Sequence, residues 1–160
     1  MRKIDELLLA YGESHRHPTN KAVHWLCVPA IMFSLLGLLW NLPATPLQLL
    51  PGLEQEPLAN WSVVLLILAS LYYIRLSIPL FLGMLVISAG LIYGNLRLSA
   101  LGSSMHIWAS LGIFAVAWIG QFIGHHIEGK KPSFIKDVQF LLIGPAWLMH
   151  FLYKKIGIPY

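Results

Sequence analysis

The stretch WIGQFIGHHIEGKKP, residues 118–132, ends a long apolar run with a group of polar side chains. At about 100° per residue in a helix, Gln121, His125 and Glu128 fall on one face, while His126 points to another. Polar groups are costly at the end of a membrane-embedded helix and are typical of functional sites there. This stretch therefore predicts a helix that ends at a membrane surface, with a site at that end.

The composition of the whole chain is that of a membrane protein. Of the 160 residues, 57% are hydrophobic and 11% are charged, and the mean hydropathy is +0.67. So few charged residues cannot form the polar surface of a water-soluble domain of this size. We therefore expect a single integral membrane domain over residues 1–160. A net charge of +4 without any RNA- or DNA-binding motif argues against a nucleic-acid partner.

Several apolar runs approach or reach the length of a helix that crosses about 30 Å of hydrocarbon. The predicted spans are residues 23–42, 61–76, 78–98 and 106–124. We therefore expect an all-α fold, an integral membrane helical bundle of four transmembrane helices. The last apolar stretch, residues 138–153, is interrupted by Gly144-Pro145, and we interpret it as a fifth span, a re-entrant hairpin or a surface helix. Residues 3–12 have one-sided helical periodicity and are expected to lie along the membrane surface.

The basic residues predict the orientation in the membrane. Residues 1–21 contain four Lys or Arg residues, whereas the first loop, residues 43–60, contains none. Because Lys and Arg gather on the cytoplasmic side, the N-terminus is expected in the cytoplasm. Four crossings then return Lys130, Lys131 and Lys136 to that side. The segments before the first span and after the fourth would thus share the cytoplasmic face, and the absence of a signal-peptide pattern suits a bacterial inner membrane.

Seven histidines are many for a chain of this length, and most flank the predicted cytoplasmic ends of the spans. Asn20 and His24 lie four residues apart at the start of the first span, so both can face the bundle, and His15 precedes them. Neutral imidazole is the commonest metal ligand, and its second nitrogen needs a partner, for which Asn20, Gln121 and Glu128 are candidates. We predict a metal site rich in nitrogen ligands, which suits iron, copper or zinc.

Histidines at a membrane interface are also ordinary amphipathic side chains with a polar tip in water. We interpret His17, His106 and His150 first in this way, and consider both interpretations equally for His126. The six tryptophans are interpreted mostly as an interfacial belt. The metal hypothesis is favoured for His24, which lies inside a predicted span, and for His125.

Two spaced motifs resemble those of a known family. They read Tyr11-x3-His15-x4-Asn20-x3-His24-x4-Pro29 and, after the predicted spans, Gln121-x2-Gly-His125-x2-Glu128-x3-Pro132. The chain resembles the Mpo-type family (metabolism of phytosphingosine to odd-numbered fatty acids), and the two motifs bracket most of it. The resemblance implies an Fe(II)-dependent dioxygenase that uses O₂ to convert a 2-hydroxy fatty acid into the fatty acid one carbon shorter.

The resemblance also implies roles for individual residues. By motif position, the iron ligands would be His15, His24 and His125. Three further polar residues are candidate supports of the reaction: Asn20, Gln121 and Glu128. His17 and His126 are additional candidate ligands, and the lipid tail would lie along the apolar spans. Two alternatives stay open: a zinc or di-metal membrane hydrolase with the same histidines, and a non-enzymatic haem-binding or transport protein.

Overall fold

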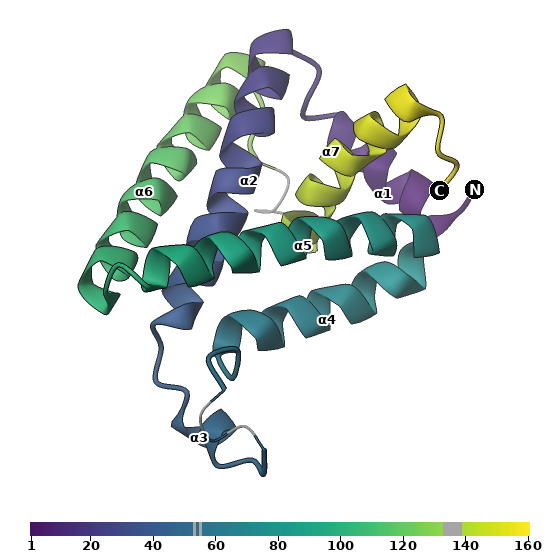
Figure 1. The fold of residues 1–160 in the computed structure, drawn as a ribbon. Coiled ribbons are helices and arrows are strands. Elements are labelled where there is room, and N and C mark those ends of the chain that lie inside the picture. The colour runs from purple at the N-terminus through teal and green to yellow at the C-terminus, as the bar shows by residue number, and fades with distance from the viewer. Residues whose placement is uncertain (53, 55, 133–138) are drawn as a thin grey trace.

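The computed structural model describes residues 1–52, 54, 56–132 and 139–160, and within these ranges it contains helices and no strands (Figure 1). The helices are α1 (Lys3–Gly12), α2 (Pro18–Trp40), α3 (Thr45–Gln48), α4 (Trp61–Leu76), α5 (Ile78–Ser99), α6 (Ser103–Glu128) and α7 (Phe140–Ile156). The expected all-α fold is confirmed. Lys136, which entered the predicted orientation, lies outside the described residues.

The helices α2 and α6 lie side by side and run in opposite directions, as Figure 1 shows. Small residues of α6 allow this close approach. A Cβ atom on Gly124 would lie 2.5 Å from Asn20 Oδ1, and one on Gly120 would lie 2.7 Å from Cys27 Sγ. The antiparallel pair brings the polar end of α6 to the start of α2. These are the two segments in which the candidate ligands were predicted.

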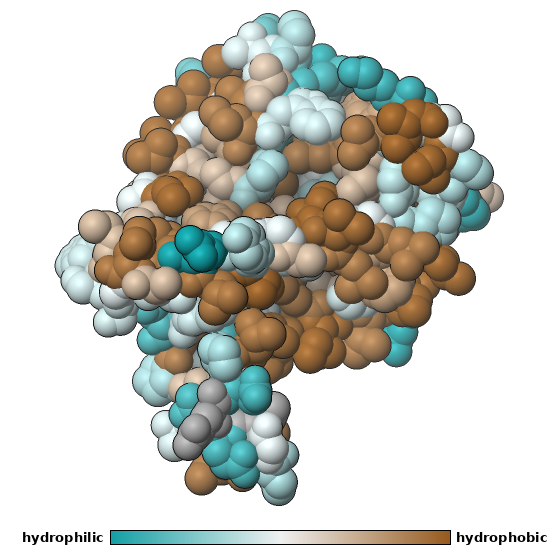
Figure 2. All heavy atoms as spheres, viewed as in Figure 1, coloured by the Kyte–Doolittle hydropathy of each residue, from teal (hydrophilic) through white to brown (hydrophobic). Residues whose placement is uncertain are grey.

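Among the residues that the structure describes, three helices, α2, α5 and α6, are long and apolar enough to cross a membrane. The helix α4 is apolar too, but its 16 residues fall short of the roughly 20 that a crossing requires, so the second predicted span, residues 61–76, and with it the count of four spans, is not confirmed. Figure 2 shows apolar side chains over much of the face formed by α4 and α5, and hydrophilic residues around α3. Exposed apolar residues such as Val86 on α5 and Val116 on α6 are the surface that a lipid-embedded helix presents.

The first and last helices, α1 and α7, pack against one another beside the start of α2. The expected surface helix α1 forms, but its apolar residues Ile4, Leu7 and Leu8 are buried in a cluster with residues of α7. The helix α7 continues through Gly144-Pro145 as one helix, so the re-entrant hairpin is wrong. It is not among the candidate spans, and a fifth span is not confirmed.

A buried polar network joins α2, α5 and α6 near the opposite end of the α2–α6 pair. His106 is 1% exposed; its Nε2 donates to Asn95 Oδ1 over 2.9 Å, and its Nδ1 accepts from Asn41 Nδ2 over 3.1 Å. Asn95 Nδ2 in turn donates to the carbonyl of Phe33. The interpretation of His106 as an interfacial side chain with a wet tip is therefore wrong, because protein side chains satisfy both ring nitrogens and water is not needed.

Candidate metal centre

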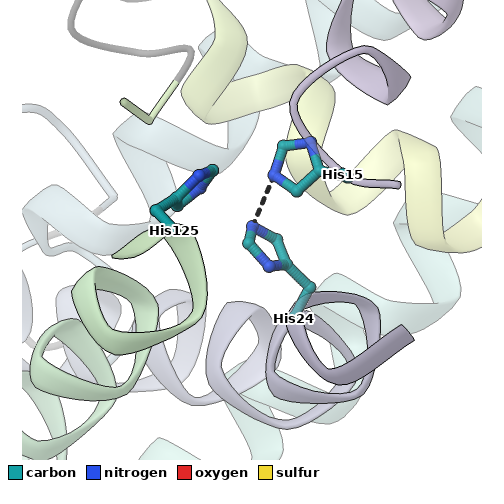
Figure 3. A group of neighbouring side chains, drawn as sticks. All are labelled: His15, His24 and His125. Atoms are coloured by element: carbon teal, nitrogen blue, oxygen red, sulfur yellow. Dashed lines mark hydrogen bonds between the residues drawn. The ribbon is translucent and has the colours of Figure 1, made fainter. Parts of the chain in front are cut away.

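Three histidines from separate segments meet in the buried interior, and we call His15, His24 and His125 the histidine trio (Figure 3). His15 lies in the loop after α1, His24 in the second turn of α2, and His125 in the last turn of α6. One ring nitrogen from each lies within 4.8 Å of those of the other two. None of the three side chains is more than 4% exposed. The juxtaposition expected from the sequence is thus present.

Backbone carbonyls fix two of the three rings. His15 Nδ1 donates to the carbonyl of Tyr11 over 2.6 Å, and His24 Nδ1 donates to the carbonyl of Asn20 over 3.0 Å. Because a carbonyl only accepts, both Nδ1 atoms carry hydrogen, and Nε2 of a neutral ring then holds a lone pair. These two Nε2 atoms face each other at 2.8 Å. Two lone pairs at this distance repel, so the arrangement calls for a shared cation.

The burial of His15 and His24 favours a metal ion over a proton as the cation between them. Burial lowers the pKa of His15 to about 4, although the hydrogen bond to the Tyr11 carbonyl raises that pKa in part. The ring is therefore neutral near pH 7, and a proton shared with His24 would require a charged imidazole in a site that disfavours one. Neutral imidazole is also the form that binds metal ions. A metal ion bound by both Nε2 atoms would remove the repulsion between their lone pairs without protonating either ring.

The third histidine, His125, also offers a nitrogen to a metal ion. The ring of His125 interacts with the backbone of Lys130, but its buried Nδ1 makes no hydrogen bond of normal geometry within the described residues. An unsatisfied buried group of this kind costs about 1–3 kcal/mol, which a bound metal ion would remove. Two nitrogens about 2.1 Å from one metal and at right angles lie about 3 Å apart, close to the observed 2.8 Å between His15 and His24. Three neutral imidazoles suit iron, zinc or copper.

Aromatic side chains from α1 and α7 hold the His15 ring in place. Tyr11 stacks on it with ring centroids 4.1 Å apart and an angle of 17° between the planes, and Trp147 lies 5.3 Å from it. Trp147 is 4% exposed, so its interpretation as an interfacial residue is wrong. No pattern in the sequence identifies it, because α7 is apolar on several faces and its neighbours come from distant segments.

Glu128 and Asn20 hold the loop that carries His15. The carboxylate of Glu128 accepts from the backbone N–H groups of Arg16, over 2.9 Å, and His17, over 2.8 Å. Asn20 Nδ2 donates to the same carboxylate over 3.2 Å and to the carbonyl of Ser14 over 3.1 Å. A carboxylate is favourable at these N–H groups because the start of α2 leaves them unpaired. The end of α6 is thereby tied to the loop before α2.

The remaining candidate ligands lie outside the histidine trio. His17 is exposed, and its Nδ1 accepts from the backbone N–H of Thr19 at the start of α2. His126 is exposed on another face of α6. Gln121 is buried one helical turn before His125, and its Nε2 has no hydrogen-bond partner in the described part of the chain.

Two hollows reach the histidine trio from different sides. An apolar cavity of about 60 Å³ between α2, α6 and α7 is lined by His24, His125 and Gln121 at its polar end. A wider groove of about 790 Å³ between α1 and α7 is lined in part by His15 and carries the basic side chains of Arg16, Lys21 and Lys154. The site therefore borders an apolar space on one side and a polar, basic space on the other.

Fold and site together define a class of protein: an all-helical chain with candidate membrane spans and a buried trio of neutral histidines beside an apolar cavity. Residues 1–156 match the model of the family described as 2-hydroxy-palmitic acid dioxygenase Mpo1-like, and the chain belongs to that family. A curated relative, 2-hydroxy-palmitic acid dioxygenase MPO1 of Saccharomyces cerevisiae, is 31% identical over 92% of this chain and 78% of the relative. No solved structure gives a significant match.

Proposed function

We propose that this protein is an Fe(II)-dependent dioxygenase that uses O₂ to convert a 2-hydroxy fatty acid into the fatty acid one carbon shorter. The observation that carries the proposal is the buried histidine trio, whose facing nitrogens fit a transition metal, beside an apolar cavity. Membership of the family and the name of the yeast relative support the substrate class. The relative is named for 2-hydroxy-palmitic acid, and we extend that activity to this chain.

His15, His24 and His125 would hold the iron. When bound, iron would supply the redox chemistry with O₂ and open positions for the carboxylate and hydroxyl of the substrate, since three imidazoles leave coordination sites free. The carbonyls of Tyr11 and Asn20 keep two rings in the tautomer that offers Nε2. The apolar wall of the cavity would keep water from one side of the trio and would contact the part of the substrate next to its reacting head.

We further propose that the site lies at the cytoplasmic face of a bacterial inner membrane. Basic residues gather at this end of the bundle, including Arg16, Lys21 and Lys130, whose Nζ donates to the carbonyl of Glu13. Such a basic rim is attracted to anionic lipid and to a fatty-acid carboxylate. In a Cys27→Ala background, a cysteine at the exposed position Glu13 should be labelled only from the cytoplasm, and one at Gln48 only from the other side. The opposite pattern contradicts this orientation.

The geometry disfavours the haem-binding alternative. Two axial nitrogens on opposite sides of a haem iron lie about 4 Å apart, given metal–nitrogen bonds of about 2 Å. The Nε2 atoms of His15 and His24 are only 2.8 Å apart. The cavity of about 60 Å³ also leaves no room for a porphyrin. The hydrolase alternative uses the same ligands, so the bound metal and the need for O₂ distinguish it.

The proposed function is tested with protein purified without O₂. We expect stoichiometric iron, and conversion of 2-hydroxyhexadecanoic acid to pentadecanoic acid only after O₂ is admitted. The product is measured by mass spectrometry, and chelated protein reloaded with zinc serves as the inactive control. Protein that contains zinc alone and is active without O₂ would instead support a hydrolase.

A further inference from the structure

Gln121 is a buried amide whose role the histidine trio does not explain. Its side chain is 4% exposed and lines the apolar cavity together with His24 and His125. The sequence suggested that it supports an imidazole ring, yet the Nδ1 atoms of His15 and His24 are held by backbone carbonyls. Gln121 Nε2 has no partner among the residues that the structure describes. A buried N–H group left without an acceptor is rare and calls for a ligand.

The cavity is lined by both polar and apolar side chains. The polar ones include Gln121 and the two histidines, and the apolar ones come from α2, such as Val28 and Ile31, and from α7. Leu141 of α7 lines the cavity and is 45% exposed, so the wall of the cavity reaches the surface of the molecule at α7. A volume of about 60 Å³ holds only a few water-sized groups. The space therefore suits the head of an amphiphile, whose long chain must extend out of the cavity.

We propose that Gln121 recognises the head of the substrate, with its Nε2–H group donating a hydrogen bond to an oxygen of the 2-hydroxy acid. The alkyl chain leaves the cavity between α2 and α7 into the lipid. The substrate class rests on the proposed function, whereas the role of Gln121 rests on its unpaired donor. Hydroxyl and carboxylate oxygens both accept hydrogen bonds, and a charge-assisted bond is strong in an apolar space. A neutral amide provides it without adding a buried charge.

Gln121 precedes His125 by one turn on the same helix face. A head group held by Gln121 therefore lies next to the ring nitrogens of His24 and His125, with the reacting carbons close to the trio. Gln121 is thus a specificity-determining residue, and its loss should change ligand binding and leave the metal in place.

The test compares Gln121→Met, which keeps the length of the side chain but removes the donor, with Gln121→Glu, which replaces the donor with an acceptor. The exposed Gln48 of α3 offers a matched control, Gln48→Glu. Binding of 2-hydroxyhexadecanoic acid, hexadecanoic acid and hexadecane-1,2-diol is measured by calorimetry in detergent without O₂. The metal content and melting temperature of each variant are measured alongside.

We expect Gln121→Met to bind 2-hydroxyhexadecanoic acid about 10-fold more weakly or worse, with unchanged metal content. Gln121→Glu should bind it more weakly still, because its carboxylate opposes an anionic head, and Gln48→Glu should match the wild type. A loss shared with hexadecanoic acid assigns the bond to the carboxylate, and a loss shared with the diol assigns it to the hydroxyl.

Two results overturn the inference and leave the proposed function standing. One is wild-type affinity in Gln121→Met, and the other is metal content that falls together with affinity, which would make Gln121 a support of the metal centre. A wild-type protein that holds metal but binds none of the three ligands contradicts the proposed function itself, and the inference with it.

Discussion

His106 and the histidine trio are similarly buried, but the protein satisfies the ring nitrogens of His106 and not all of those in the trio. Both nitrogens of His106 are paired with amide side chains, those of Asn95 and Asn41. In the trio, by contrast, two Nε2 atoms face each other at 2.8 Å, and His125 Nδ1 makes no hydrogen bond of normal geometry in the described part of the chain. Burial alone therefore does not identify a functional histidine. The distinguishing feature is a nitrogen that the protein itself leaves unsatisfied.

The largest expected effect is the loss of a trio member. His15→Ala, His24→Ala and His125→Ala should each abolish O₂-dependent shortening of a 2-hydroxy fatty acid, because each removes a ligand that no neighbour replaces. Iron content should fall in step, as measured by elemental analysis of purified protein. Iron-loaded, active protein after His125→Ala would contradict the assignment of the site.

A smaller loss is expected at the residue that ties the two halves of the site together. In Glu128→Gln, an amide N–H group would face one of the backbone N–H groups of Arg16 and His17, so the loop that carries His15 should loosen. Residues that orient metal ligands typically contribute about 10–100-fold in affinity or activity. Iron titration and turnover should both decline within that range while the site still loads. Wild-type values in both assays would show that the loop is held by other contacts.

The opposite pattern, a loss of stability without a loss of iron, is expected for His106, whose two ring nitrogens are hydrogen-bonded. His106→Ala leaves Asn95 and Asn41 without their shared partner, which costs about 1–3 kcal/mol of stability. The melting temperature in detergent should therefore fall, whereas iron content and specific activity of the folded protein should match the wild type. His106→Gln, which can keep one of the two hydrogen bonds, should lose less. Loss of iron in either variant at a temperature where it remains folded would break the contrast between the two regions.

The smallest effects are expected at the exposed histidines. His17→Ala removes the side chain that accepts the N–H of Thr19 and should lower stability by about 1 kcal/mol, as loss of a helix cap does. His126→Ala should change neither stability nor iron content, because its side chain is exposed and lies outside the trio. Thermal denaturation and elemental analysis measure both. A fall in iron content for His126→Ala would add this residue to the ligand set.

Much of the fold could be predicted from the sequence, because apolar runs and turn residues determine helix bounds locally. The predicted span over residues 61–76 coincides with α4, and the turn at Ser77 separates it from α5. The meeting of His24 and His125 was expected because they lie at the ends of the first and fourth predicted spans, which an even number of crossings places on one membrane face. What could not be predicted depends on contacts between distant segments. Trp147 beside His15 is one such contact, and the pairing of His106 with Asn41 is another.

The function of Glu128 illustrates the same limit. Its place on the face of α6 that carries His125 was visible in the sequence, and it suggested a partner for an imidazole ring. Its actual partners include backbone N–H groups at the start of α2, and sequence does not display which backbone groups a helix leaves unpaired. Residues 61–76 were predicted as a transmembrane span from their apolar composition, yet the 16 residues of the resulting helix α4 fall short of the roughly 20 that a crossing requires.

The central claim is that the histidine trio holds iron, and X-ray absorption at the iron edge tests it most directly. For protein purified without O₂, the account predicts iron bound by imidazole nitrogens at about 2.1 Å. The His106→Ala variant should give the same spectrum, and His125→Ala should lose it together with the iron. Protein without iron, iron with no imidazole shell, or an unchanged spectrum in His125→Ala would contradict the account.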